Sequence, residues 1–246
     1  MASPFSLWQL PGIQPEPAWP PAGAVAGRLG SIPAGPVQVL ALALPADPEP
    51  WLAALRPWAS ELRLQRAARL PSPGAALRCL AAEALLRHAL RASHGLELDT
   101  QVVRVNRYGK PRLAALPHVH FNLSHSGAWL VCALHDRPVG IDIEATRARL
   151  DLPADLILHP AEQVEQRGLE PAAARDHFFR LWTLKESLLK ALGTGLGLDP
   201  RSILVAGAGP GYRAILAGRG LATWPLLELP GPEGLRVALC HATGKS

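Results

Sequence analysis

Residues 139–144 read VGIDIE and carry two carboxylates two positions apart. On a strand, Asp142 and Glu144 lie on the same face, because side chains alternate along a strand. Two carboxylates on one face repel each other unless a cation lies between them. Oxygen ligands select a hard divalent cation such as magnesium, whereas an exposed strand face would leave both carboxylates in water. The spacing alone leaves both interpretations open.

Residues 178–190, FFRLWTLKESLLK, form the second candidate group. On a helix, Trp182, Glu186 and Lys190 recur every four positions and share one face. An exposed Glu186–Lys190 ion pair contributes about 0.3–0.5 kcal/mol, but the surrounding helix is apolar on most sides. A compact ammonium group suits phosphate binding in a chain that otherwise uses arginine. Three of the four lysines lie here or in the segment YGKP: Lys110, Lys185 and Lys190.

The third candidate group is the segment FNLSHSG at residues 121–127, in which Ser124 and Ser126 flank His125. Adjacent serine and histidine indicate a hydrolase only weakly, since neighbours in sequence seldom form a triad and no G-x-S-x-G elbow is present. The nearby histidines and Cys132 fit no standard set of zinc ligands. The glycine at the end of the segment lets a backbone approach a ligand.

The elements that position these residues fall into two similar groups. The first contains a strand at 37–44, a helical region at 51–70 interrupted at Pro57, and an amphipathic helix at 75–93 followed by Gly95. The second contains a helix at 171–192 closed by Gly193. Short strands are predicted at 102–106, 121–124, 129–134, 139–144, 202–205, 212–216, 224–227 and 235–241.

This pattern predicts an α+β fold with two similar, pseudo-symmetric halves, each a small antiparallel sheet packed on a long helix. The expected boundaries are 37–137 for the N-terminal half and 138–246 for the C-terminal half. Residues 1–36 hold eight prolines and no apolar periodicity, which favours an extended proline-rich arm.

Composition excludes several classes of protein. With 48% hydrophobic and 18% charged residues, the 246-residue chain can bury a sizeable core, so wholesale disorder is excluded. Three cysteines without paired spacing, and a start unlike a secretion signal, predict a cytoplasmic protein. The net charge of +5 suits an anionic partner. The sequence lacks, however, the runs of basic residues interleaved with aromatic residues that are typical of nucleic-acid binding. We expect no nucleic-acid and no membrane partner.

The segments YGKP, FNLSHSG, GIDIE and WTLKESLLKALGTGL follow one another in this order and resemble the surfactin-type 4′-phosphopantetheinyl transferases. The match runs from about Arg63 to Gly197. The resemblance implies an active site at the seam between the halves. It also implies an enzyme that moves the phosphopantetheine group of coenzyme A onto a carrier-protein serine and releases adenosine 3′,5′-bisphosphate.

The resemblance further implies a magnesium ion, replaceable by manganese, that is held by Asp142, Glu144 and Glu186. Lys190 would add a donor at the pyrophosphate. Glu186, directly or through a metal-bound water, is the first candidate for the base that takes the serine proton, and Glu162 is the second.

Coenzyme A, the second substrate, is expected to contact a set of basic and polar residues. Arg63 and Arg66 stand where the family places basic residues near the 3′-phosphate, although both could belong to a solvated helix face. Cys79 stands where some relatives carry a hydroxyl. The full set expected to bind coenzyme A is Arg63, Arg66, Arg78, Lys110, Ser124, His125, Lys185 and Lys190.

The expected protein partner is an acidic apo acyl or peptidyl carrier protein, and the enzyme is expected to be a monomer. The resemblance places carrier docking at residues 145–160, where Arg147 and Arg149 mix with leucines; an ordinary connection whose leucines join the core is the alternative. A magnesium-dependent phosphatase or nuclease acting on a nucleotide is the alternative function. Carriers of fatty-acid, polyketide, peptide-synthetase and lysine pathways all stay open.

Overall fold

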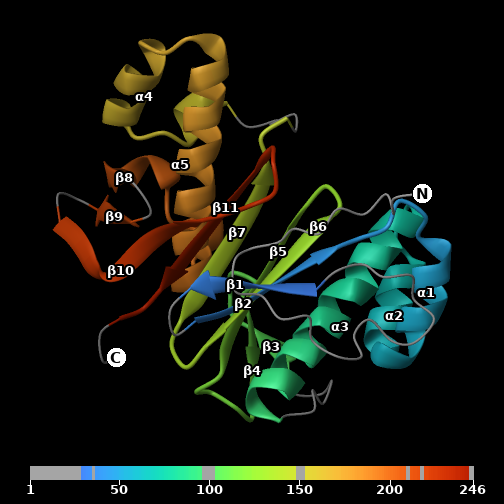
Figure 1. Cartoon of the computed structure of the whole chain (residues 1–246). Helices are drawn as coiled ribbons and strands as arrows, with labels where there is room; N and C mark the ends of the chain where they lie inside the picture. Colours follow the sequence, from blue (N-terminus) through green and yellow to red (C-terminus); the bar gives the residue numbers. More distant parts are fainter. Residues whose placement is uncertain are drawn as a thin grey trace.

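The computed structural model describes residues 29–34, 37–95, 103–147, 153–208, 211–216 and 219–243. Figure 1 shows two antiparallel sheets, each accompanied by one long helix. This arrangement confirms the predicted α+β class with two similar halves. Most of the proline-rich arm lies outside the described residues.

The first sheet has the strand order β1-β2-β6-β5. Its strands are β1 (Leu29–Ala34), β2 (Val37–Ala43), β5 (His120–Ser126) and β6 (Trp129–His135). The helix α3 (Pro73–His94) packs on it through an apolar face that includes Leu77, Leu80 and Leu90. Ser72 accepts a hydrogen bond from the Ala75 amide at the start of α3, and Gly95 ends it with a φ of 62°.

Three short helices and a small hairpin complete the first half. The region predicted as one interrupted helix consists of α1 (Glu49–Leu55), the 3-10 turn η1 (Arg56–Trp58) and α2 (Glu61–Ala68). The break falls at the predicted Pro57, because proline lacks the amide that a continuing helix needs. The strands β3 (Val103–Val105) and β4 (Pro111–Leu113) form a separate two-stranded sheet.

The second sheet has the order β7-β11-β10-β9-β8 and packs on α5 (Pro171–Leu192). Its strands are β7 (Val139–Ala145), β8 (Ile203–Ala208), β9 (Gly211–Leu216), β10 (Arg219–Leu229) and β11 (Leu235–His241). The shorter elements of this half are α4 (Pro160–Arg167), η3 (Ala154–Leu156), η4 (Gly195–Gly197) and η5 (Pro200–Ser202).

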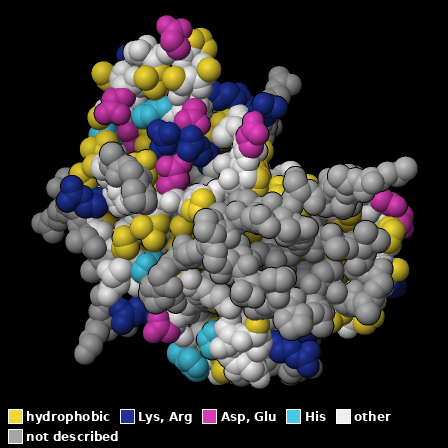
Figure 2. All heavy atoms as spheres, viewed as in Figure 1, with side chains coloured by type: hydrophobic (Ala, Val, Ile, Leu, Met, Phe, Trp, Pro, Cys, Tyr) yellow, Lys and Arg dark blue, Asp and Glu magenta, His cyan; other side chains and the backbone are white. Residues whose placement is uncertain are grey.

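Charged side chains of both signs gather over α5 and the second sheet in Figure 2. There Arg236 reaches Asp176 of α5 and Glu228 of β10, while Arg180 lies 3.0 Å from Asp176 and 3.6 Å from Glu228. This network attaches the N-terminal part of α5 to the second sheet. The C-terminal part of α5 carries residues of the candidate site.

Two strands were not predicted, β1 and β4. Residues 29–34 were assigned to the arm, but they form β1, which pairs with β2 from Leu29 opposite Leu42 to Ala34 opposite Val37. The strand contains Pro33, and proline is tolerated there because β1 is an edge strand. The apolar periodicity of residues 29–34 did not predict β1, because this strand is formed by its hydrogen-bonded pairing with β2.

The two sheets meet where β5 and β7 lie side by side. The Asn122 side chain accepts a hydrogen bond of 2.8 Å from the Ile141 amide, and Ser126 accepts one of 2.9 Å from the Ala145 amide. An apolar cluster that includes Val39 and Val131 of the first sheet continues into Ile141 of the second. The two halves share this core, and a domain boundary at residue 137 stays a prediction.

No helix in the described ranges is long and apolar enough to cross a membrane.

Candidate active site

The three predicted carboxylates lie at the junction of β7 and α5. Asp142 and Glu144 extend from β7, and Asp142 is only 2% exposed. Glu186 extends from α5, where burial, opposed by Lys190 and helped by the charges of Asp142 and Glu144, raises its pKa to about 7. Burial and then the Asp142 charge also raise the pKa of Glu144. The three groups therefore lie close enough to repel one another.

Asp142 has one satisfied oxygen and one bare oxygen. Its Oδ1 accepts hydrogen bonds from Ser124 Oγ at 2.8 Å and from Lys190 Nζ at 2.5 Å, and Lys190 Nζ also donates to Ser124 Oγ at 2.9 Å. Its Oδ2 is buried and has no hydrogen-bond partner in the part of the chain that the structure describes. Such an atom is rare in folded proteins and indicates a site for a cation or donor.

Glu144 is held by two side chains that the sequence analysis did not assign to the site. Trp182 Nε1 donates to Glu144 Oε1 at 3.1 Å, and Ser126 Oγ donates to Oε2 at 3.3 Å. The shared helical face of Trp182, Glu186 and Lys190 was visible in the sequence, and it could have indicated that the indole reaches the same cluster.

The donors suit a hard divalent cation, since all are carboxylate oxygens on adjoining elements and one is unpaired. Within the described ranges, however, no three side chains of Asp, Glu, His or Cys are placed as a formed metal cluster. The Lys190 ammonium group lies on Asp142 in this arrangement. The residue types and the bare oxygen fit magnesium, and the ion itself belongs to the proposal below.

Basic groups extend from this cluster toward the first half. His125 lies at the end of β5, and burial followed by the positive charges of Arg78 and Lys190 lowers its pKa. Arg63, on α2, donates from Nε to Glu83 at 2.9 Å, and its Nη1 lies 3.9 Å from Cys79. Arg66 is exposed on the same helix.

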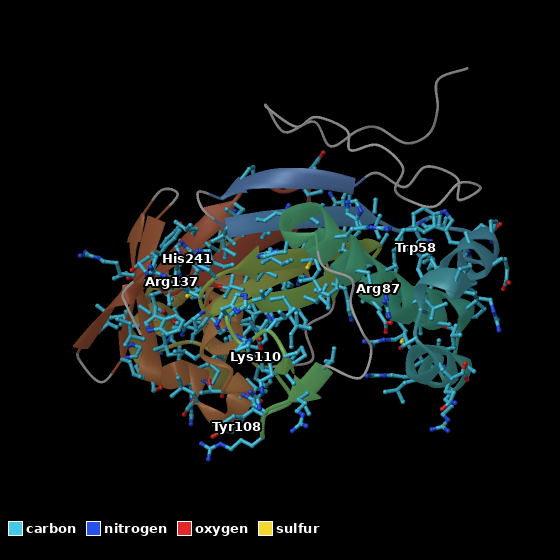
Figure 3. The ribbon with its side chains drawn as sticks, turned by 90° about the horizontal axis from the view of Figure 1, so that it is seen from below. Trp58, Arg87, Tyr108, Lys110, Arg137 and His241 are labelled. Carbon is cyan, nitrogen blue, oxygen red and sulfur yellow. The ribbon has the colours of Figure 1, made fainter. Side chains whose placement is uncertain are left out.

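Lys110 joins elements of the seam. Its Nζ donates to the carbonyl oxygens of Val139 at 3.0 Å and Ala191 at 2.8 Å. Burial lowers the pKa of Lys110, which is labelled in Figure 3, to about 8. Asn106, in the turn between β3 and β4, donates from Nδ2 to the Gly193 carbonyl at 2.8 Å. This bond attaches the β3–β4 hairpin to the C-terminal end of α5. The Lys110 amine thus connects β7 to α5. Because its donors already bind these two carbonyl oxygens, the hydrogen bonds compete with the predicted contact between Lys110 and a phosphate.

Lys185 and Glu162 lie apart from the carboxylate cluster. They form a fully buried ion pair of 2.6 Å, and Lys185 also donates to the carbonyls of Ile157 and Pro200. Glu162 also accepts from the Val205 amide at 2.9 Å. The geometry therefore disfavours the predicted coenzyme A contact of Lys185 and the predicted proton transfer by Glu162. Lys185 neighbours Glu186 in sequence, but a helix turns by about 100° per residue and points it away.

The predicted docking segment is only partly described. Arg147 is exposed just after β7, while Arg149 lies outside the described residues. Further on, Ile157 and Leu158 are buried in the core of the second half, whereas Leu156 is 48% exposed. Two of its apolar residues thus join the core, as the alternative interpretation expected.

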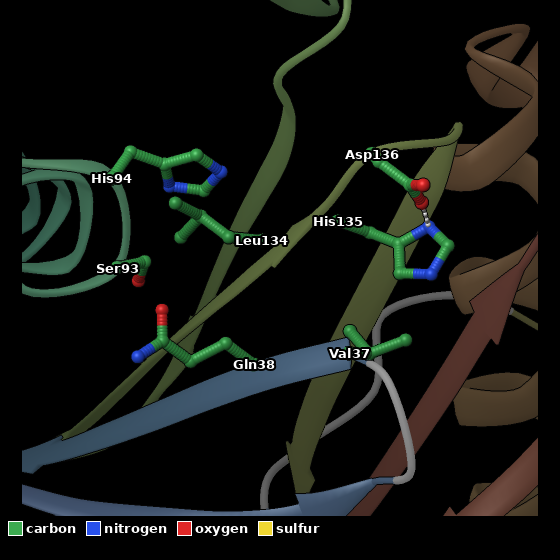
Figure 4. A pocket seen from close by; sticks show the side chains of 7 residues that line it. All are labelled: Val37, Gln38, Ser93, His94, Leu134, His135 and Asp136. Carbon is green, nitrogen blue, oxygen red and sulfur yellow. Dashed lines mark ion pairs between the residues drawn. The ribbon is translucent and has the colours of Figure 1, made fainter. Parts of the chain in front are cut away.

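A cavity of about 420 Å³ lies away from these residues, between α3 and the ends of β2 and β6 (Figure 4). None of its lining residues is a predicted site residue. They are Val37, Gln38, Ser93, His94, Leu134, His135 and Asp136.

Comparison with known proteins identifies the family. The family model of the 4′-phosphopantetheinyl transferase superfamily matches residues 138–240. A 4′-phosphopantetheinyl transferase of Bacillus subtilis is 35% identical over 166 residues, 67% of this chain and 74% of the relative. The 4′-phosphopantetheinyl transferase HetI of Nostoc sp. (strain PCC 7120) is 34% identical over 207 residues, 81% of this chain and 85% of the relative. A solved holo-[acyl-carrier-protein] synthase of Thermotoga maritima matches 44% of this chain and 64% of its own length at 21% identity, with a TM-score of 0.36. The chain belongs to the 4′-phosphopantetheinyl transferase family.

Proposed function

We propose that this chain transfers the 4′-phosphopantetheine group of coenzyme A to a serine of an apo acyl or peptidyl carrier protein and releases adenosine 3′,5′-bisphosphate. Family membership supports the transfer. The observation that carries the site is the bare, buried Oδ2 of Asp142 beside the carboxylates of Glu144 and Glu186. The relatives described above are transferases, so they do not favour the phosphatase or nuclease alternative.

Asp142, Glu144 and Glu186 would hold a magnesium ion, for which manganese could substitute. Bound there, magnesium acts as a Lewis acid toward the pyrophosphate of coenzyme A. Trp182 and Ser126 fix the Glu144 carboxylate, which keeps its oxygens oriented toward the cluster. Lys190 lies 2.5 Å from Asp142 and can turn its remaining donor toward a phosphate oxygen.

In the transfer, the carrier serine oxygen attacks the phosphorus next to pantetheine, and the bond to the bridging oxygen of the pyrophosphate breaks. Lys190 places a positive charge where negative charge grows on the leaving adenosine 3′,5′-bisphosphate. Glu186 is the candidate acceptor of the serine proton. Its pKa of about 7 belongs to the metal-free protein, and a divalent cation held beside it would lower that pKa and keep the carboxylate ionised.

Binding of the nucleotide end is assigned to the first half of the chain. Arg63, Arg66 and Arg78 supply positive charge for the 3′-phosphate, and His125 lies near enough to Arg78 and Lys190 for both charges to lower its pKa. The carrier protein would dock beside Arg147, because carriers of this class are acidic. A cytoplasmic, monomeric enzyme stays a prediction from the sequence.

The test is mass spectrometry of a panel of apo carrier proteins incubated with the enzyme, coenzyme A and magnesium. We expect at least one carrier to gain one phosphopantetheine group, with release of an equal amount of adenosine 3′,5′-bisphosphate, and we expect chelation to stop both. Asp142→Asn should abolish transfer, whereas Asp47→Asn, which changes an exposed carboxylate just before α1, should not. Hydrolysis of coenzyme A without any modified carrier would favour the phosphatase alternative.

A further inference from the structure

Glu83 is a buried carboxylate on α3 that the proposed mechanism does not use. Its side chain is 7% exposed and lies between α2 and α3. It accepts hydrogen bonds from the Ser60 amide at 2.9 Å and from Ser60 Oγ at 3.1 Å. It also accepts from Arg63 Nε at 2.9 Å and from Arg87 Nε and Nη2 at 3.2 and 2.9 Å. Figure 3 shows Arg87 beside the helices of the first half.

The bond to Glu83 determines how Arg63 presents its guanidinium group. Arg63 donates to Glu83 through Nε, the nitrogen on the side of the group, and the terminal nitrogens do not take part. Nη1 has only a weak contact of 3.9 Å with Cys79, and Nη2 makes no hydrogen bond among the described residues. The side chain is 30% exposed. The fork of Arg63 is therefore held in a fixed direction with its two terminal nitrogens available to an anion.

The ionisation of Glu83 supports a lasting bond to Arg63. Arg63 and Arg87 each lie 2.9 Å from a carboxylate oxygen of Glu83. Burial would raise the pKa of Glu83, but the hydrogen bonds from Arg63, Ser60 and Arg87 outweigh burial and lower it. Glu83 stays ionised at neutral pH and can hold Arg63 continuously.

We propose that Glu83 is a positioning residue for nucleotide recognition: it fixes Arg63 so that the terminal nitrogens of Arg63 meet the 3′-phosphate of coenzyme A. This inference rests on the proposed function, in which Arg63 binds that phosphate. Cys79 and Glu83 are four residues apart on α3 and so lie on one face under Arg63. The sequence alone gave no sign of this arrangement, because Glu83 and Arg63 are twenty positions apart.

The hydrogen bonds of Glu83 would be the same if Glu83 only stabilised the fold and did not position Arg63 for the phosphate. Glu83 holds Ser60, whose hydroxyl accepts from the Arg63 amide and caps α2, and it joins α2 to α3. Loss of that role would lower stability and would affect every donor substrate alike. Only the positioning role predicts a loss confined to donors that carry the 3′-phosphate.

The experiment compares coenzyme A with 3′-dephospho-coenzyme A as donors, with the carrier protein at saturation. We expect the wild type to favour coenzyme A in kcat/KM by about tenfold or more, as a charge-assisted hydrogen bond implies. In Glu83→Gln this preference should fall to about threefold or less. The loss should come from a higher KM for coenzyme A, with kcat retained and the constants for 3′-dephospho-coenzyme A unchanged.

Glu61→Gln is the matched control, since Glu61 lies on α2 and is exposed, and among the described residues its side chain accepts one hydrogen bond, from Gln65. It removes the same charge from the same region and should keep the full preference. Arg63→Lys is the second variant, because it keeps the positive charge but loses the fork that Glu83 orients. Arg63→Lys should lose most of the preference for coenzyme A over 3′-dephospho-coenzyme A. This variant tests the inference if Glu83→Gln does not fold.

Full preference in folded Glu83→Gln, or in Arg63→Lys, would overturn the inference while leaving the transfer activity in place. Equal loss with both donors in Glu83→Gln would assign Glu83 a structural role only. A wild type that transfers without preferring coenzyme A would overturn the assignment of Arg63. A wild type that modifies no carrier would instead overturn the proposed function itself.

Discussion

Glu186→Gln should stabilise the metal-free protein at alkaline pH. The pKa of Glu186 is raised from 4.5 to about 7, first by burial and then by the charges of Asp142 and Glu144. Between these two values the folded state holds a proton that the unfolded chain has released, so the free energy of unfolding falls as pH rises. A tenfold change in proton affinity is about 1.4 kcal/mol, and the ionised carboxylate therefore costs about 3 kcal/mol at pH 8. At pH 5 the same group costs about 1 kcal/mol or less.

The assay is urea unfolding followed by tryptophan fluorescence, with a chelator present, from pH 5 to pH 8. Glu186→Gln keeps the shape of the side chain and removes the charge, so its free energy of unfolding should exceed that of the wild type by about 2–3 kcal/mol at pH 8. The difference should shrink by about 2 kcal/mol toward pH 5. Glu170→Gln is the control, since Glu170 is exposed at the start of the same helix and makes no capping bond. A variant less stable than the wild type at pH 8, or a difference independent of pH, would refute this electrostatic argument.

Three further predictions concern packing, the buried ion pair and the partner. Gly140→Ala should lower the free energy of unfolding by about 3 kcal/mol or more, because the new methyl group would lie 2.1 Å from a backbone atom of α5. Gly74→Ala, whose nearest atom is 3.9 Å away, should be nearly neutral in the same urea titration. Lys185→Met should cost about 3–5 kcal/mol by leaving Glu162 charged and buried, and a rise in KM for coenzyme A without lost stability would contradict this structural role. Arg147→Glu should raise KM for the carrier at low salt and leave KM for coenzyme A unchanged; equal changes in both would make Arg147 structural.

Short-range patterns predicted which side chains share a face, whereas only the family resemblance implied that Asp142, Glu144 and Glu186 form one site. Alternation along a strand predicted a shared face for Asp142 and Glu144, and the four-residue period predicted that Glu186 and Lys190 point together. Both patterns are local and depend only on the geometry of one strand or one helix. The hydrogen bond between Lys190 and Asp142 confirms that the two elements meet at these residues.

Long-range partners could not be predicted in the same way. Lys185 pairs with Glu162 across 23 positions, and Lys110 donates to a carbonyl 81 positions away. Such contacts depend on how the helices and sheets pack, and a lysine that binds phosphate looks the same in sequence as one that binds carbonyls. The strand β1 was missed for the same reason, since its order comes from pairing with β2.

The most direct test of the central claim, that Asp142, Glu144 and Glu186 together hold one divalent cation, is a titration of the protein with manganese in the presence of coenzyme A. Free manganese is measured by electron paramagnetic resonance. The account predicts one bound ion per chain, displaced by magnesium, and an affinity lower by about tenfold or more in Asp142→Asn and in Glu186→Gln. One manganese ion bound with wild-type affinity by the Asp142→Asn/Glu186→Gln double variant would contradict it.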